Sequence, residues 1–149
     1  MTGRSYFLAC FAILALLAAP PASAELVVVA NASSGVERLS RDEVINIFLG
    51  RYRQLPSGIA ALPIDQPSGS PVKAQFYRKL VNKDLAEINT YWARLTFSGK
   101  TSPPRQAAST AEVLDWLAST RGAIGYVERE KLDERAKDER IRIVLELTP

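Results

Sequence analysis

A short segment of small and hydroxyl-bearing residues, Ser68-Gly69-Ser70-Pro71, is the part of the sequence best suited to hold an anion. Ser70 is typical of a helix N-cap and Pro71 of the first helical position, so a helix is expected to begin here. The free N–H groups and the positive dipole end of such a helix attract phosphate or carboxylate without any catalytic residue. We therefore expect Ser68, Gly69 and Ser70 to be ligand-binding residues.

The charge near this expected helix start differs from that of two other expected helices. Those two begin at a serine and carry a glutamate at the third helical position, which complements the dipole: Ser40 with Glu43, and Ser109 with Glu112. After Ser70, the same position holds Lys73. A cation there is unfavourable unless an anion joins it, which favours anion binding. The alternative is an ordinary N-cap beside a solvated lysine.

A second small polar loop, Asn31 to Gly35, follows the apolar and β-branched run 26–30, which predicts a strand buried on both faces. Ligands of α/β sheets gather at the carboxyl ends of strands. We therefore expect Asn31, Ser33 and Ser34 to supply further hydroxyl and amide donors to the same ligand. The alternative is a turn made of ordinary turn-forming residues.

The rest of the pattern predicts an α/β fold, with a mixed sheet of about four or five strands flanked by helices. Gly50 and Gly122 are expected to close the first and last of four main helices. Residues 128–140 carry charges of both signs and are expected to form a solvated helix or loop. Strands are expected at 26–30, 60–65, 123–127 and 141–147, the last one alternating and half exposed, and helices after Ser40, Ser70, Asp84 and Ser109.

The composition excludes several classes of function. The chain has no histidine and one cysteine, Cys10, so it can build neither a Ser-His-Asp nor a Cys-His site, and a zinc site would need carboxylates alone. Asp65 lacks a partner for acid–base work, and Trp92 and Tyr126 are expected in the core. The net charge is +3 with both signs interspersed. We expect no enzyme activity, no metal, no cofactor and no nucleic acid partner.

The N-terminal segment has the three parts of a secretory signal. Arg4 is basic, residues 6–19 are apolar but too short to span a bilayer, and Ala22-Ser23-Ala24 has the small residues of a cleavage site. We expect cleavage near Ala24, which divides the chain into a signal peptide at 1–24 and one domain at 25–149. The protein is then expected to be periplasmic or secreted.

Several segments in order resemble the substrate-binding proteins of phosphate ABC transporters, in particular small single-lobe members of the type 2 periplasmic-binding-protein-like group. The segments are Leu39 to Arg51, Ser68 to Ser70, Tyr91 to Lys100 and Gly122 to Val127. The resemblance implies a phosphate gripped by Ser68, Gly69 and Ser70, with Asn31, Ser33 and Ser34 as first-loop counterparts. Ile64 stands where the family has an arginine, and Leu55 replaces a family tryptophan.

Two functions from different classes remain open. The first is a non-catalytic periplasmic solute-binding protein or lobe for phosphate or a similar oxyanion, linked to ABC transport. Because one lobe buries only one side of a small anion, a second protein or a second copy in a homodimer would complete the site. The alternative is a ligand-less interaction module that docks on a membrane sensor or transport component, through a surface such as the Arg51 to Arg53 rim.

Overall fold

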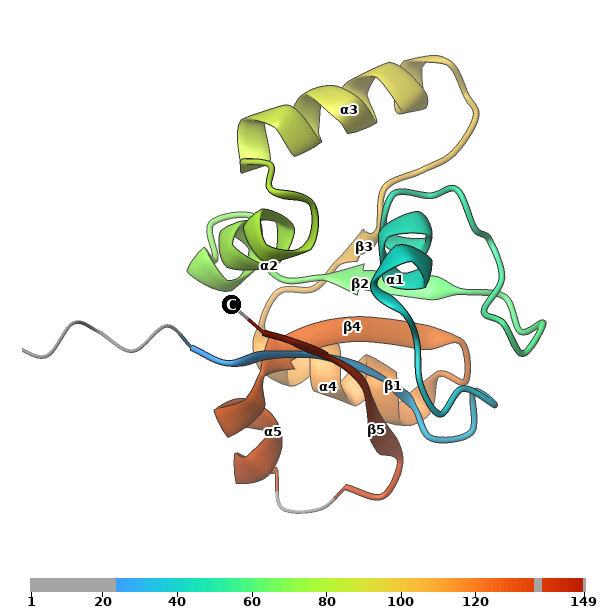
Figure 1. The fold of residues 1–149 in the computed structure, drawn as a ribbon, viewed down its shortest axis with the longest axis vertical. Helices are drawn as coiled ribbons and strands as arrows, with labels where there is room; N and C mark the ends of the chain where they lie inside the picture. The colour runs from blue at the N-terminus through green and yellow to red at the C-terminus, as the bar shows by residue number, and fades with distance from the viewer. Residues whose placement is uncertain (1–23, 136–137, 149) are drawn as a thin grey trace, which may run out of the picture.

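The computed structural model describes residues 24–135 and 138–148, so the expected signal peptide lies outside the described residues except for Ala24. Ten elements follow one another along this part of the chain (Figure 1). The strands are β1 (Leu26–Asn31), β2 (Leu62–Asp65), β3 (Arg105–Gln106), β4 (Ala123–Glu128) and β5 (Ile141–Leu147). The helices are α1 (Arg41–Phe48), α2 (Pro71–Val81), α3 (Leu85–Phe97), α4 (Thr110–Ser119) and α5 (Arg129–Glu134).

The five strands form one mixed sheet in the order β3-β2-β4-β1-β5. β2 pairs in parallel with both of its neighbours, β3 and β4, whereas β1 pairs antiparallel with β4 and β5. Ala30 near the end of β1 therefore lies opposite Ile124 near the start of β4. As a result, the carboxyl end of β1 lies at the opposite end of the sheet from the carboxyl ends of β2 and β4.

Helices cover both faces of the sheet and create two apolar cores. On one face, α1, α2 and α3 bury residues such as Phe48, Phe76 and Trp92 against the sheet or one another. On the other face, α4 packs Val113 and Leu117 against β1 and β4. Figure 1 shows α1 and α2 on one side of the sheet, α4 on the other, and α3 outermost. The β1 run is fully buried, as its continuous apolar sequence predicts.

Local capping explains where most helices begin. Ser40 and Glu43 form the expected capping box at α1, and Gly50 follows this helix with φ +75°. At α4, the Ser109 hydroxyl accepts from the Glu112 N–H, but the Glu112 carboxylate accepts from Ala108 instead of Ser109. The expected reciprocal box is thus displaced by one residue.

Gly122 does not close α4, contrary to expectation, because the helix ends at Ser119 with Thr120 as its cap. A Cβ added at Gly122 would lie 2.0 Å from the Ala60 carbonyl oxygen. Its own carbonyl accepts from the Leu62 N–H at 2.9 Å, where β2 meets β4. The glycine is therefore required by close backbone approach, not by helix termination.

The last strand departs from the simple alternation of its sequence. The β1–β5 register shifts between Val28 and Val29, so that Val28 faces Leu145 and Val29 faces Ile143. Val144 is the extra residue of this β-bulge. The bulge moves Ile143 to the core beneath α4 and leaves Leu145 on the core beneath α1 and α2. Among residues 24–135 and 138–148, no helix has the length and apolar character needed to cross a bilayer.

Candidate functional site

Two helices that start at neighbouring strand ends leave the sheet on opposite faces. α2 follows β2 and packs on the α1 side, whereas α4 follows β3 and packs on the other side (Figure 1). Because β2 and β3 are adjacent and parallel, their carboxyl ends meet at one edge of the sheet. Such a change of face is the switch point at which open α/β sheets bind ligands in a crevice.

The side chain of Gln66 joins the two helix starts. Its Oε1 accepts a hydrogen bond from the Thr110 hydroxyl at 3.0 Å, and its Nε2 donates to the Tyr126 carbonyl at 2.9 Å. Gln66 is almost fully buried, so these contacts compete little with water. The distance between the α2 and α4 N-termini is therefore fixed by a side chain that sequence reasoning did not single out.

The Ser68 to Ser70 loop lies at this switch point. The Ser70 hydroxyl accepts from the Val72 N–H at 3.2 Å, which confirms the expected N-cap of α2. Ser68 and Gly69 are exposed. Within the described part of the chain, the Ser68 and Gly69 amides and the Ser68 hydroxyl have no hydrogen-bond partner. These three donors are available to a ligand.

Lys73 has a partner within the protein. Its ammonium lies 3.6 Å from the Asp65 carboxylate, and the two side chains are 12% and 6% exposed. Neither an external anion nor bulk solvent is therefore needed to explain a lysine in the first turn of α2. The charge contrast that favoured an external anion is accounted for by Asp65, which is the last residue of β2.

Asp65 is the centre of a buried polar network beneath the loop. Its carboxylate accepts from the Tyr126 hydroxyl at 2.7 Å and from the Tyr77 hydroxyl at 3.0 Å. Burial raises the pKa of Asp65 above its usual range, while Lys73 and the two hydroxyls partly oppose this rise. Burial, reinforced by the Asp65 charge, also raises the pKa of both tyrosines, so that they remain donors.

Sequence reasoning predicted Tyr126 as a core residue but did not identify Tyr77 or the role of Asp65. The available signal was on α2, where Lys73 and Tyr77 are one helical turn apart and face the same direction. An ammonium and a phenol on one helix face, directly after a strand that ends in aspartate, indicate a shared carboxylate. The network packs beneath the Ser68 to Ser70 loop and holds the base of the loop in place.

The start of α4 also lies at the switch point, which was not predicted from the sequence. The Thr110 and Ala111 amides occupy the first two helical positions and have no partner among the described residues. The Glu112 carboxylate, however, lies at this same helix end, where it binds the Ala108 N–H. The α4 terminus thus combines free donors with a negative charge that opposes a bound anion.

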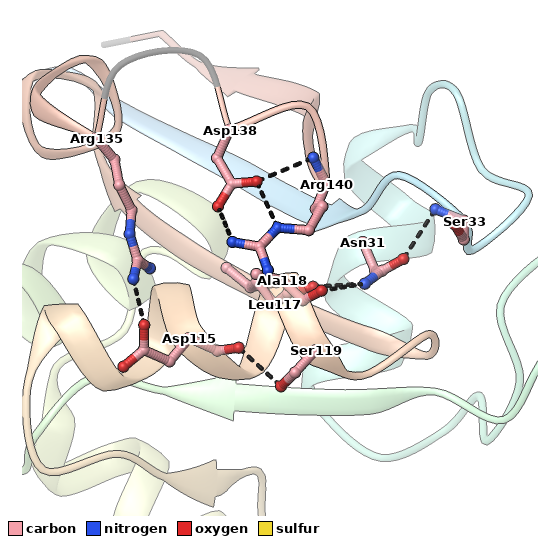
Figure 2. A network of polar contacts seen from close by, with 9 residues as sticks. All are labelled: Asn31, Ser33, Asp115, Leu117, Ala118, Ser119, Arg135, Asp138 and Arg140. Atoms are coloured by element: carbon pink, nitrogen blue, oxygen red, sulfur yellow. Dashed lines mark hydrogen bonds and ion pairs between the residues drawn. The ribbon is translucent and has the colours of Figure 1, made fainter.

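Asn31 and Ser33 do not belong to this site, because antiparallel β1 carries them to the opposite end of the sheet. Figure 2 shows that the Asn31 amide donates to the Leu117 carbonyl, at 2.7 Å, and to the Ala118 carbonyl. Its Oδ1 accepts from the Ser33 N–H at 2.8 Å. Asn31 therefore ties the end of α4 to the β1 turn, and the expectation of one shared ligand is wrong.

Ser34 is also a structural residue. It is fully buried, and its hydroxyl accepts from the Val36 N–H at 3.3 Å. Its carbonyl accepts from the Ser57 hydroxyl at 2.6 Å. The first polar loop is therefore a turn held by its own side chains, which was the alternative interpretation.

The candidate loop lies at the surface, with Ser68 and Gly69 exposed. Five hollows on the surface of the described residues have no lining residue between Ser68 and Ser70. In the same part of the chain, no three His, Cys, Asp or Glu side chains cluster in a way that could hold a metal ion. What the loop offers chemically is a set of N–H and O–H donors at the surface.

No family model and no curated protein matches the chain, but ten chains of known structure do. One, from Clostridium perfringens, is described as a phosphate ABC transporter substrate-binding protein with bound phosphate; it is 13% identical, with a TM-score of 0.62. The match covers 85% of this chain and 48% of that one. An ABC-type phosphate transport receptor from Vibrio cholerae is 12% identical, with a TM-score of 0.61 and coverages of 81% and 45%.

A third match is the substrate-binding domain of a protein described as a molybdenum ABC transporter from Clostridium difficile. It is 16% identical, with a TM-score of 0.50, and the match covers 84% of this chain and 43% of that one. At these identities, the likeness shows the fold alone. This chain spans less than half the length of each of these proteins. The match confirms the expected α/β fold of a single periplasmic-binding-protein-like lobe.

Proposed function

We propose that this chain is a non-catalytic solute-binding lobe that binds phosphate or a similar tetrahedral oxyanion at the switch point between β2 and β3. The observation that carries the proposal is the set of unpartnered donors there, the Ser68 and Gly69 amides and the Ser68 hydroxyl. The Ser70 hydroxyl accepts at the N-cap and still has its own proton to donate. The proposed site is therefore Ser68, Gly69 and Ser70.

The fold supports this assignment by analogy. The structural neighbours are described as binding proteins or domains of phosphate and molybdenum transporters, and phosphate is a tetrahedral oxyanion. Because the loop is exposed, a small anion would be covered on one side only. We propose that a second protein or a second copy of this chain covers the other side, as part of ABC transport.

We also propose that the protein acts outside the cytoplasm, with residues 1–24 as its signal peptide and 25–149 as its domain. The basic, apolar and small-residue parts of the N-terminal sequence support this proposal. Mass spectrometry of the protein recovered from a periplasmic fraction would test it. A mature N-terminus at Glu25 is expected, and a chain that keeps residues 1–24 would contradict it.

A second candidate function is a docking module that has kept the fold without binding an anion. It is favoured by the two carboxylates already present at the switch point. Asp65 neutralises Lys73 at the start of α2, and Glu112 lies at the start of α4. An external anion must bind near both of them, which reduces its affinity.

Isothermal titration of residues 25–149 with phosphate and sulfate tests the first candidate, using Ser70→Asp as the variant. Aspartate is as good an N-cap as serine, so the helix is retained while a negative charge is added at the site. Ser40→Asp is the matched control, since it makes the same change at the N-cap of α1. Arg41, the residue after Ser40, donates through its guanidinium to the Lys79 carbonyl near the C-terminus of α2. The control position therefore lies at the end of α2 opposite to Ser70.

The proposal predicts saturable heat for an oxyanion with the unaltered chain and with Ser40→Asp. It predicts affinity at least about tenfold lower for Ser70→Asp, because the added charge repels the ligand at close range. Absence of heat for every oxyanion, from a chain shown to be folded, would favour the docking module. Equal weakening by the two variants would mean that binding follows net charge and not this site.

A further inference from the structure

A basic hollow lies away from the oxyanion site, between the end of α1 and the segment that links α3 to β3. Its volume is about 670 Å³, and its lining includes Arg53, Lys100 and Arg105 but no carboxylate. The starting residues of β2, Leu62 and Pro63, also line it. It extends along β2 to Arg105, which pairs with Ile64, but Ser68, Gly69 and Ser70 do not line it, so it is distinct from the proposed oxyanion site.

Two of the three cations, Arg53 and Arg105, are held in place, and none of the three is neutralised. The Arg53 guanidinium donates to the Lys100 carbonyl at 2.6 Å, which fastens the linker to the end of α1. The Arg105 guanidinium lies 4.3 Å from the centre of the Trp116 ring. Across the described residues, none of the three has a carboxylate partner.

Four other arginines of the described residues pair with carboxylates, whereas others, such as Arg38 and Arg94, have no carboxylate partner there. Arg135 pairs with Asp115, and Arg140 pairs with Asp138 (Figure 2). Arg129 contacts both Glu25 and Glu146. The hollow differs from the other four hollows in its lining, which has three cations and no carboxylate, whereas each of the others includes at least one Asp or Glu. A concave surface with one sign of charge concentrates ligands of the opposite sign.

One aromatic residue lines the hollow, and another lies two residues before its lining segment in the chain. Tyr52 lines it and is 50% exposed. Phe97, the last residue of α3, precedes the lining segment that starts at Gly99, and its side chain is 96% exposed. Arginine and aromatic residues together are characteristic of the centres of protein interfaces.

We propose that this hollow is a docking site for an acidic peptide segment of a partner protein, with its carboxylates on Arg53, Lys100 and Arg105. The volume is far larger than one tetrahedral oxyanion fills, whereas it suits several side chains of an extended segment. β3 is the edge strand of the sheet, so such a segment can lie beside it without displacing another strand. A concave hollow also fits a peptide better than the flat surface of a membrane.

Fluorescence anisotropy with a fluorescein-labelled peptide of alternating glutamate and leucine residues tests this docking site, using residues 25–149. Lys100→Glu is the principal variant, because the hydrogen bond to Arg53 uses the Lys100 backbone and is retained. Arg38→Glu is the matched control, because Arg38 is exposed, lines the hollow beside β5 and changes the net charge equally. A peptide with glutamine in place of glutamate controls for apolar association.

The expected result is saturable binding of the acidic peptide that Lys100→Glu weakens by at least about tenfold and that Arg38→Glu leaves within about twofold. Raising the salt from 50 to 500 mM should weaken it by a similar factor. Binding that glutamine peptides share, or that both variants reduce equally, would overturn the proposal. Absence of peptide binding would also overturn it. If phosphatidylglycerol vesicles bound through Lys100 while the peptide did not, the proposal of a peptide site would likewise be overturned.

The result is separable from the oxyanion proposal. Phosphate titration of Lys100→Glu should match that of the unaltered chain, because Lys100 lies in the linker before β3 and the hollow shares no lining residue with the Ser68 to Ser70 loop. Peptide binding without phosphate binding would support the hollow and contradict the oxyanion site, and the reverse result would do the opposite.

Discussion

The ammonium of Lys73 lies 3.6 Å from the carboxylate of Asp65, so the first turn of α2 has an anion of its own. The pair is largely excluded from water, with side chains only 12% and 6% exposed. Two tyrosine hydroxyls donate to the same carboxylate and complete its hydrogen bonding. The loop that carries the free donors therefore lies above an ion pair whose two charges cancel and whose carboxylate is fully hydrogen-bonded. Oxyanion affinity must then come from Ser68, Gly69 and Ser70.

Replacing Asp65 with asparagine should destabilise the protein by about 3 kcal/mol at pH 7, because it leaves the mostly buried Lys73 ammonium without a counter-ion. Urea unfolding followed by circular dichroism measures this change. The double variant Asp65→Asn/Lys73→Met removes both charges and should recover at least about half of the loss. A single variant as stable as the parent would mean that the pair contributes nothing.

The stability attributable to Asp65 should rise as the pH is lowered from neutrality. Burial raises the pKa of Asp65 in the folded protein above the ordinary value of 3.8, so the folded state binds a proton more tightly than the unfolded chain. This contribution is fully present below pH 3.8 and is lost as the pH rises through the folded pKa. Urea unfolding between pH 4.5 and 7 should therefore show the parent gaining stability relative to Asp65→Asn as the pH falls. A difference that shrinks toward low pH would contradict the raised pKa.

Much of the secondary structure follows from short-range signals. Ser40 with Glu43 places the start of α1, and Ser70 with Pro71 places the start of α2, because the groups that cap a helix lie within a few residues of its end. The continuous apolar run of β1 predicts burial on both faces. The two-residue strand β3, by contrast, has no sequence signal of its own and exists because Arg105 and Gln106 pair with β2.

Strand direction and partner choice could not be predicted in the same way. An apolar run such as residues 26–30 has the same sequence pattern in a parallel and in an antiparallel strand. The prediction that Asn31 lies beside Ser68 therefore had no support in the local sequence. The bulge at Val144 is equally invisible in a regular alternation. The Asp65 network joins residues up to 61 positions apart in the chain, and only the tertiary fold brings them together.

Asn31→Ala should destabilise the protein by about 2 kcal/mol, because the buried Leu117 carbonyl and the Ser33 amide both lose a partner. Thermal unfolding measures the loss. Ser33→Ala is the control and should change stability by less than about 0.5 kcal/mol, since Ser33 is exposed and contributes only its backbone. Phosphate affinity should be the same in both variants, and a selective loss in Asn31→Ala would return the first loop to the binding site.

Gly122→Ala should destabilise the protein by about 3 kcal/mol, since the added methyl group would collide with the Ala60 carbonyl 2.0 Å away. Gly69→Ala is the matched control, because a Cβ there meets no atom within 4 Å. It should alter stability by less than about 0.5 kcal/mol. Chemical denaturation of both variants checks the pair. Equal stabilities would show that β2 and β4 approach less closely than described.

The central claim, an oxyanion site at the β2–β3 switch point, is tested most directly by following backbone amide resonances of a ¹⁵N-labelled protein during titration with phosphate. The account predicts saturable shifts at Ser68, Gly69 and Thr110, whose amides have no partner among the described residues. It also predicts unchanged resonances at Ser33 and Ser34, at the other end of the sheet. Shifts confined to the first loop, or no saturable shift at Ser68 and Gly69, would contradict it.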